Sequence, residues 1–124
     1  MPRLPVGMQY FKDFDLDENE VAVSTVPCTI FGWDLFHDAA ATVFVQLYDA
    51  ALADVTVGTT VPDLTLGIGA NLHNRLSLPG GITFNIACTA VCVTDPETGA
   101  TTGPGTNECI CNIFFLNTSR RSGA

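Results

Sequence analysis

Residues 42–48 read TVFVQLY, and this stretch decides the fold class of the chain. Val43, Val45 and Leu47 fall on every second position, which is the pattern of a β-strand with one buried face. Gly, Pro, Asn and Asp separate this run from others of its kind. Those others alternate in the same way or carry apolar residues on both faces: LTLGI (64–68), ITFNIACTAVCV (82–93) and CICNIFFL (109–116). The pattern predicts an all-β protein.

The spacing of the runs predicts one β-sandwich or jelly-roll domain over residues 21–117, because short strands separated by turn signals are typical of these folds. The 124 residues leave room for a single domain. A helical turn is expected only around residues 34–41. The turn-rich stretch 95–107 is expected to form an exposed tip, and residues 118–124 a short C-terminal tail.

Residues 1–20 differ in composition from the rest of the chain. Five of the 13 acidic residues lie between Asp13 and Glu20. No strand or helix period runs for long there, so we expect either an extended arm that is ordered by docking or a disordered terminus. If it docks, the partner contacts are expected from its large apolar side chains: Tyr10, Phe11, Phe14 and Leu16.

The formal charge of −8 argues against two classes of partner. An acidic surface repels the phosphates of nucleic acids and the headgroups of anionic lipids. No run approaches the roughly 18 apolar residues of a membrane span, and the first residues do not read as a signal peptide. Arg120 and Arg121 are read as part of a solvated tail.

Four of the five cysteines are predicted to form a buried thiol cluster. Within each strand their spacing places them on one face, and a hairpin across 95–107 would bring the two strands together. An extended strand separates Cys88 from Cys92 by roughly 13 Å, too far for one zinc ion. Free thiols are the expected state, while one cross-strand disulfide, from Cys92 to Cys109 or Cys111, stays open. The cluster comprises Cys88, Cys92, Cys109 and Cys111.

No motif predicts a catalytic, cofactor-binding or metal-binding residue. His37 and His73 have no nucleophile or second histidine at a recognised spacing, so both are read as loop or surface residues. The acidic run from Asp13 starts like a calcium loop but lacks the required glycine and final glutamate, so a solvated charge run is the preferred interpretation. We expect a protein without enzymatic activity.

The order of several segments resembles a group of small structural proteins of tailed bacteriophages. The shared order is an LY strand, a VGT-x-x-P turn, an LTL strand, a PGG-I-x-F corner and a final aromatic strand. It covers about residues 30–117. The segments here are VFVQLYDA (43–50), TVGTTVPDLTLGI (56–68), LPGGITF (78–84) and CNIFFLN (111–117).

This resemblance implies a virion structural protein made in the host bacterial cytoplasm. The role that it favours is a decoration or cement protein on the capsid surface, with the major capsid protein as partner. Copies are expected to associate, as trimers by analogy with the three-fold sites of capsid lattices. Two alternatives stay open: a head fibre, spike or tail-associated adhesin that binds a host receptor or glycan, and a freestanding small-ligand barrel or enzyme subunit.

Overall fold

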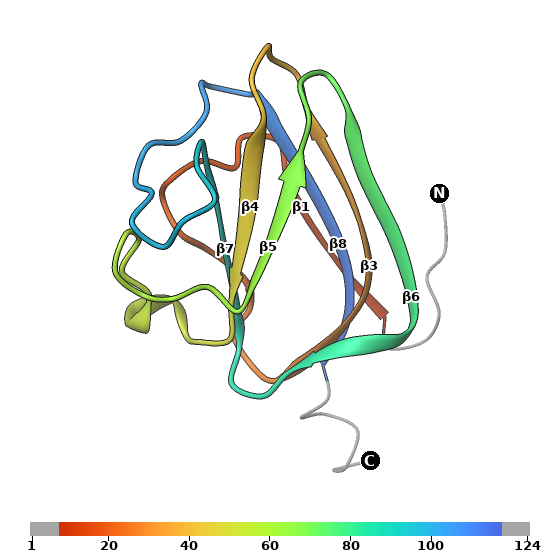
Figure 1. The fold of residues 1–124 in the computed structure, drawn as a ribbon. Helices are drawn as coiled ribbons and strands as arrows, with labels where there is room; N and C mark the ends of the chain where they lie inside the picture. Colours follow the sequence, from red (N-terminus) through yellow and green to blue (C-terminus); the bar gives the residue numbers. More distant parts are fainter. Residues whose placement is uncertain (1–7, 118–124) are drawn as a thin grey trace.

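The computed structural model describes residues 8–117 as two four-stranded antiparallel sheets, which confirms the all-β prediction (Figure 1). The only helical element in this range is a 3-10 turn, η1 (Leu52–Asp54). Sheet A has the order β1 (Met8–Asp13), β8 (Cys109–Asn117), β3 (Cys28–His37) and β6 (His73–Phe84). Sheet B has the order β2 (Val21–Ser24), β7 (Cys88–Val93), β4 (Val43–Tyr48) and β5 (Leu64–Ile68).

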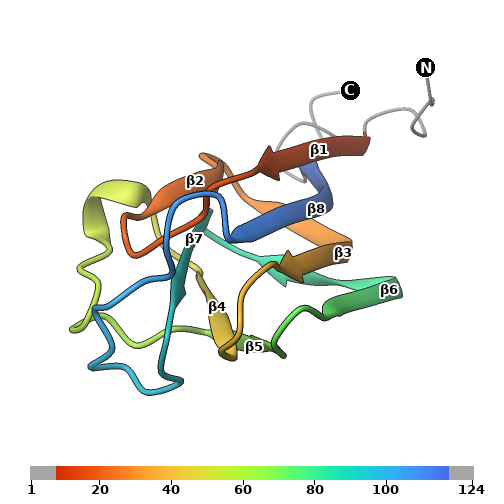
Figure 2. The same ribbon diagram turned by 90° about the horizontal axis from the view of Figure 1, so that it is seen from above.

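The main core lies between the two sheets, which form separate layers in Figure 2. Alternate side chains of each strand point into it, as the period of a β-strand requires. Sheet A contributes Leu35 and Ile113, and sheet B contributes Val45 and Leu47, all of them fully buried. Burial of these alternating apolar residues is the main stabilising term of the fold.

A second, smaller core covers the outer face of sheet B. Two long connections, residues 49–63 and 94–108, fold back over β4 and β7 and lie beyond these strands in Figure 1. Tyr48 and Val91 point outward from the sheet and are buried beneath this cover. β7 is therefore buried at every position, because both of its faces are packed.

The expected strand over 82–93 is two strands that belong to different sheets. The chain leaves sheet A after Phe84 and enters sheet B at Cys88. The carboxylate of Asp49 accepts hydrogen bonds from the backbone N–H groups of the three intervening residues, at 3.1, 2.8 and 3.4 Å. These bonds replace the strand pairing that the turn lacks.

The prediction that residues 1–20 form an extended arm is wrong for residues 8–20, the part of this segment that the structure describes. Residues 8–13 are edge strand β1, which pairs with β8 from Met8–Leu116 to Asp13–Cys111. The following segment crosses from sheet A to sheet B, and Leu16 is 0% exposed inside the main core. Residues 8–20 therefore pack with the domain that was expected to begin at residue 21, because their apolar positions find partners within the chain. Residues 1–7 and 118–124 lie outside the described residues.

Two local expectations are also wrong, and a third holds in part. Residues 34–37 are the end of β3 rather than a helical turn. Most of residues 95–107 are exposed as expected, but this connection also covers sheet B, and Ala100 is buried. β7 and β8 do not form a hairpin, since they lie in opposite sheets. Among the described residues, no helix is long and apolar enough to cross a membrane.

Candidate interaction surface

No other described segment packs on the outer face of sheet A, which is called the open face below. Residues directly opposite one another in antiparallel strands share a face, so the register arranges its side chains in rows across β1, β8, β3 and β6. Three rows span all four strands: Met8, Leu116, Thr29 and Thr83; Tyr10, Phe114, Gly32 and Ser77; and Lys12, Asn112, Asp34 and Arg75. A partial row holds Ile110, Phe36 and His73.

Apolar side chains dominate the β1 and β8 side of the open face. Tyr10 is 47% exposed, and its ring centroid lies 5.4 Å from that of Phe114 in a tilted arrangement. Met8 and Leu116 are half-buried in the adjacent row. Aromatic and aliphatic groups left at a sheet surface in this number are typical of a protein contact site.

A shallow depression of about 360 Å³ lies where β3 loses its regular pleat. The register of β3 shifts between Ile30 and Gly32 against both neighbouring strands. Met8, Phe114 and Ser77 of the open face line the depression, and Gly32 has no side chain to fill it. A Cβ atom on Gly32 would lie 2.8 Å from the carbonyl oxygen of Leu76, so any other residue would push β6 away.

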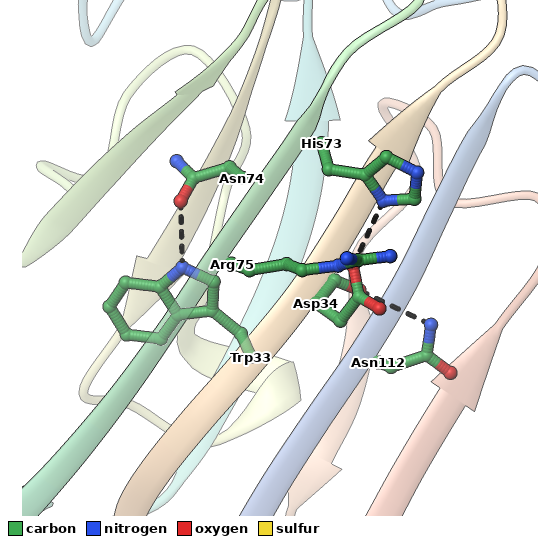
Figure 3. Close-up of polar contacts among 6 residues, drawn as sticks. All are labelled: Trp33, Asp34, His73, Asn74, Arg75 and Asn112. Carbon is green, nitrogen blue, oxygen red and sulfur yellow. Dashed lines mark hydrogen bonds and ion pairs between the residues drawn. The ribbon is translucent and has the colours of Figure 1, made fainter.

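A network of polar side chains crosses the centre of the open face (Figure 3). The Asp34 Oδ1 atom lies 3.1 Å from Arg75 Nε and 3.1 Å from His73 Nδ1. The side chain of Asn112 donates to the carbonyl oxygen of Asp34 at 3.2 Å and accepts a hydrogen bond from the Tyr10 hydroxyl at 3.3 Å. These contacts hold the polar groups in fixed orientations while leaving them accessible to solvent.

The charge of the open face differs from that of the remaining surface. Burial raises the pKa of Asp34, but hydrogen bonds from His73 and Arg75 outweigh burial, so its pKa is lowered on balance and it stays ionised. Lys12 and Arg75 are the two basic residues in the described part of the chain, and both lie on this face. Of the 13 acidic residues, only Asp34 belongs to it.

The four predicted partner-contacting residues are separated by the fold. Tyr10 lies on the open face, and Phe14 is 57% exposed with the Lys12 ammonium 4.5 Å from its ring centroid. Phe11 points inward from β1 and packs against the main core, and Leu16 lies within that core. Phe11 and Leu16 therefore stabilise this chain and are not available to a partner, which corrects the prediction for these two.

All four residues of the predicted thiol cluster are fully buried between the sheets, and all five cysteines are free. Cys88 and Cys92 come from sheet B, and Cys109 and Cys111 from sheet A, so the thiols meet across the core rather than along a hairpin. The alternative registers for a disulfide do not apply, because both assumed that hairpin. The fifth cysteine, Cys28, is also buried and was not predicted to join the others.

Burial controls the ionisation of these thiols. It raises the pKa of Cys28 to about 11, against the effect of a hydrogen bond with Ser24. Burial raises the pKa of Cys88 and Cys111 further. A hydrogen bond with Cys109 and burial together raise the pKa of Cys92. Protonated, inaccessible thiols are poor nucleophiles, so the cluster acts as part of the apolar core.

His37 is buried, against the expectation of a loop or surface residue, whereas His73 is a surface residue as expected, although it lies in a strand. His37 is 1% exposed at the end of β3, and its Nδ1 atom has no hydrogen-bond partner among the described residues. His73 begins strand β6 and stacks on Phe36, with ring centroids 4.6 Å apart. Within residues 8–117, no three His, Cys, Asp or Glu side chains are placed to hold a metal ion.

The sequence reasoning missed most of the open face. One signal was available, because residues 109–116 carry apolar side chains at both parities, with Ile110, Phe114 and Leu116 opposite the thiols. A strand buried on one face only would carry polar residues there.

Comparison with known proteins does not assign the chain to a family. No family model matches it, and neither a curated protein nor a solved structure does. A functional conclusion therefore depends on the open face itself.

Proposed function

We propose that the protein is a non-enzymatic structural component of a tailed-phage virion, a decoration or cement protein that assembles through its open face. The observation that carries this proposal is the different treatment of the two sheets. The chain covers the outer face of sheet B with its own loops, while no described segment covers the apolar outer face of sheet A. Such an uncovered apolar surface is typical of a protein that functions in an assembly.

The strand order supports a jelly-roll classification. The pairs β1–β8, β2–β7, β3–β6 and β4–β5 are nested, as in one long hairpin that folds over on itself. The contacts β3–β8 and β4–β7 then complete the two sheets. Jelly rolls occur in viral capsid proteins and also in lectins, so the fold agrees with a virion role without establishing it.

The open face supplies the affinity that a cement protein needs. Removing one large apolar side chain from water contributes roughly 1.5–3 kcal/mol, whereas an exposed ion pair contributes at most about 1 kcal/mol. Tyr10 and Phe114 can therefore contribute more to assembly than Lys12 and Arg75. A small contact made by these side chains would reinforce the shell when it is repeated over a lattice of capsid subunits.

The remaining surface fits the proposed partner and location. It carries twelve of the 13 acidic residues and is suited to basic regions of the major capsid protein. Five free buried cysteines agree with synthesis in the reducing cytoplasm of a host bacterium. Nucleic acid and anionic membrane are not expected as partners of so acidic a protein.

The test is the copy number of this protein relative to the major capsid protein, by quantitative mass spectrometry of purified particles that encode it. A decoration protein should be present at the same order of abundance as the capsid protein. A copy number far below that points to a fibre, spike or tail component. Absence from the particles would end the virion proposal.

One observation favours the second candidate, an adhesin that binds a host glycan. The exposed ring of Tyr10 lies beside the planar polar groups of Asn112, Asp34 and Arg75. Aromatic rings stack on sugars, and fixed planar polar groups pair with hydroxyls. Low copy number together with binding on an oligosaccharide array, abolished by Tyr10→Ala, would support this candidate over the first.

A further inference from the structure

We propose that the open face binds an acidic segment of a partner protein, in which a large apolar side chain lies close to a carboxylate. The apolar side chain occupies the depression at Gly32, and the carboxylate pairs with Arg75. The inference rests on the proposed function for the use of this face in assembly, and it adds the chemistry of the surface that binds there.

The first argument is the distribution of charge. Lys12 and Arg75 are the only lysine and arginine within residues 8–117, and both lie on the open face, where Asp34 is the one acidic residue. The other twelve acidic residues lie outside this face. An anionic partner is therefore attracted to the open face and repelled by the acids of the other described regions. Charge selects both the face and the sign of its partner.

The second argument is the state of the two cations. Arg75 is 65% exposed and pairs with Asp34 through Nε, which leaves the far edge of the guanidinium for a second acceptor (Figure 3). Asp34 is thus a positioning residue for Arg75. Among the described residues, no carboxylate lies within ion-pair distance of Lys12. A guanidinium that is held on one edge is suited to bidentate pairing with a carboxylate on the other.

The third argument is the position of the depression. Met8, Phe114 and Ser77 line it, and Gly32 contributes no side chain. Gly32 pairs with Ser77, and Arg75 lies two residues before Ser77 on β6. Two residues of a strand span about 6.6 Å and neighbouring strands lie about 4.8 Å apart, so Gly32 and Arg75 are about 8 Å apart. In an extended partner segment, residues two positions apart point to the same side at nearly this spacing.

A protein fits this face better than a nucleic acid or a glycan does. The acids around the open face repel a phosphate backbone. A neutral glycan gains nothing from the excess of cations on the face, whereas the apolar rows that hold Met8 and Phe114 suit the aromatic and aliphatic groups of a protein. Charge and apolar surface therefore point to the same class of partner.

The test is the binding of capped peptides to the 124-residue chain, followed by the shifts of its amide resonances. The probe holds phenylalanine and glutamate two positions apart among glycines and serines, and its counterpart holds glutamine in place of glutamate. The glutamate peptide should bind about fivefold more tightly, and added salt should reduce this preference, because it screens an exposed ion pair. Arg75→Gln should remove most of the preference.

The apolar part of the contact has its own variant and control. Phe114→Ser should weaken the binding of both peptides at least about fivefold, because it removes a wall of the depression. The matched control is Val61→Ser, which removes an apolar side chain that is 71% exposed on a loop, and it should bind as the wild type does. Circular dichroism and thermal unfolding establish that each variant is folded, and Arg75→Gln alone decides if Phe114→Ser is not.

Three results would overturn the proposal: no binding of the glutamate peptide, equal binding of the two peptides, or a preference that Arg75→Gln leaves unchanged. Binding of neutral oligosaccharides at this face without that preference would assign the face to a glycan instead. A protein that is abundant on particles but lacks the preference removes only this inference. A protein that shows the preference but is absent from particles removes only the virion role.

Discussion

The outer faces of both sheets carry large apolar side chains, but the chain covers these side chains on only one of the two sheets. On sheet B, Tyr48 and Val91 point away from the main core and are buried by the connections 49–63 and 94–108. On sheet A, Tyr10 and Phe114 occupy equivalent outward positions and remain accessible. An outward aromatic residue is thus buried by the chain's own loops on one sheet and left accessible to solvent on the other.

The polar groups of the two faces follow the same division. Gln46 on sheet B is fully buried, donates to the carbonyl oxygens of Pro96 and Glu97 at 3.3 Å each, and accepts from the Tyr48 hydroxyl at 3.1 Å. Asp34 on sheet A has two partners of the same chain and stays 37% exposed. The comparison teaches that stability should depend on the sheet B face and assembly on the sheet A face.

The strongest test of this comparison is a pair of aromatic deletions. Tyr48→Ala should lower the free energy of unfolding by roughly 3–5 kcal/mol, because it opens a cavity beneath both loops. Phe114→Ala should cost less than about 1.5 kcal/mol in dilute protein, because its ring is already partly hydrated. Urea unfolding curves measure both. Similar losses from the two variants would remove the distinction between the faces.

The buried thiols between the two sheets allow a second test, because their ionisation makes the free energy of unfolding depend on pH. The pKa of Cys28 is raised from 9.0 to about 11, so its stabilising contribution is complete below about pH 9, where the unfolded thiol is still protonated. That contribution is lost as the pH rises from 9 towards 11, and two pKa units correspond to about 2–3 kcal/mol. Urea unfolding at about pH 7 and about pH 10.5 should show the loss, and Cys28→Val should reduce it. Identical curves at both pH values would show that the thiols are not held protonated.

Removal of Gln46, the polar side chain that anchors the 94–108 connection, should give the next largest loss of stability. Gln46→Ala removes the side chain that holds residues 96 and 97 over sheet B and leaves the Tyr48 hydroxyl without its acceptor. The expected loss is about 1–3 kcal/mol, the cost of unpaired buried polar groups. Hydrogen exchange should increase in the 94–108 connection, and Gln46→Glu, which keeps an acceptor for Tyr48, separates the two causes. Unchanged exchange there would contradict the anchoring role.

The smallest effect is expected on the open face. Asp34→Asn should cost at most about 1 kcal/mol near neutral pH, because the paired groups are well solvated. The folded pKa of Asp34 is lowered, so its contribution is present above the unfolded carboxyl pKa and is lost as the pH falls through the folded value. Wild type and variant should therefore differ at neutral pH and converge in acid. A larger cost than that of Gln46→Ala would reverse the comparison.

Local pattern predicted several strands closely. The alternation in TVFVQLY became β4, LTLGI became β5 with the same bounds, and the last predicted strand became β8. These segments have clear periods because one face packs against the core. Local pattern failed where the chain changes sheets: the 82–93 run shows no break in polarity at Asn85–Ala87, and the turn there depends on Asp49, which is distant in sequence.

By itself, the sequence determined the all-β class, the acidic charge and the apolar character of both faces of β8, because each depends on composition or on neighbours along one strand. Only the tertiary structure decided that residues 8–13 join a sheet, that the thiols meet from opposite sheets, and that the loops cover sheet B and leave sheet A open. Strand pairing between distant segments fixes these features, since the free energy of burial depends on which faces meet.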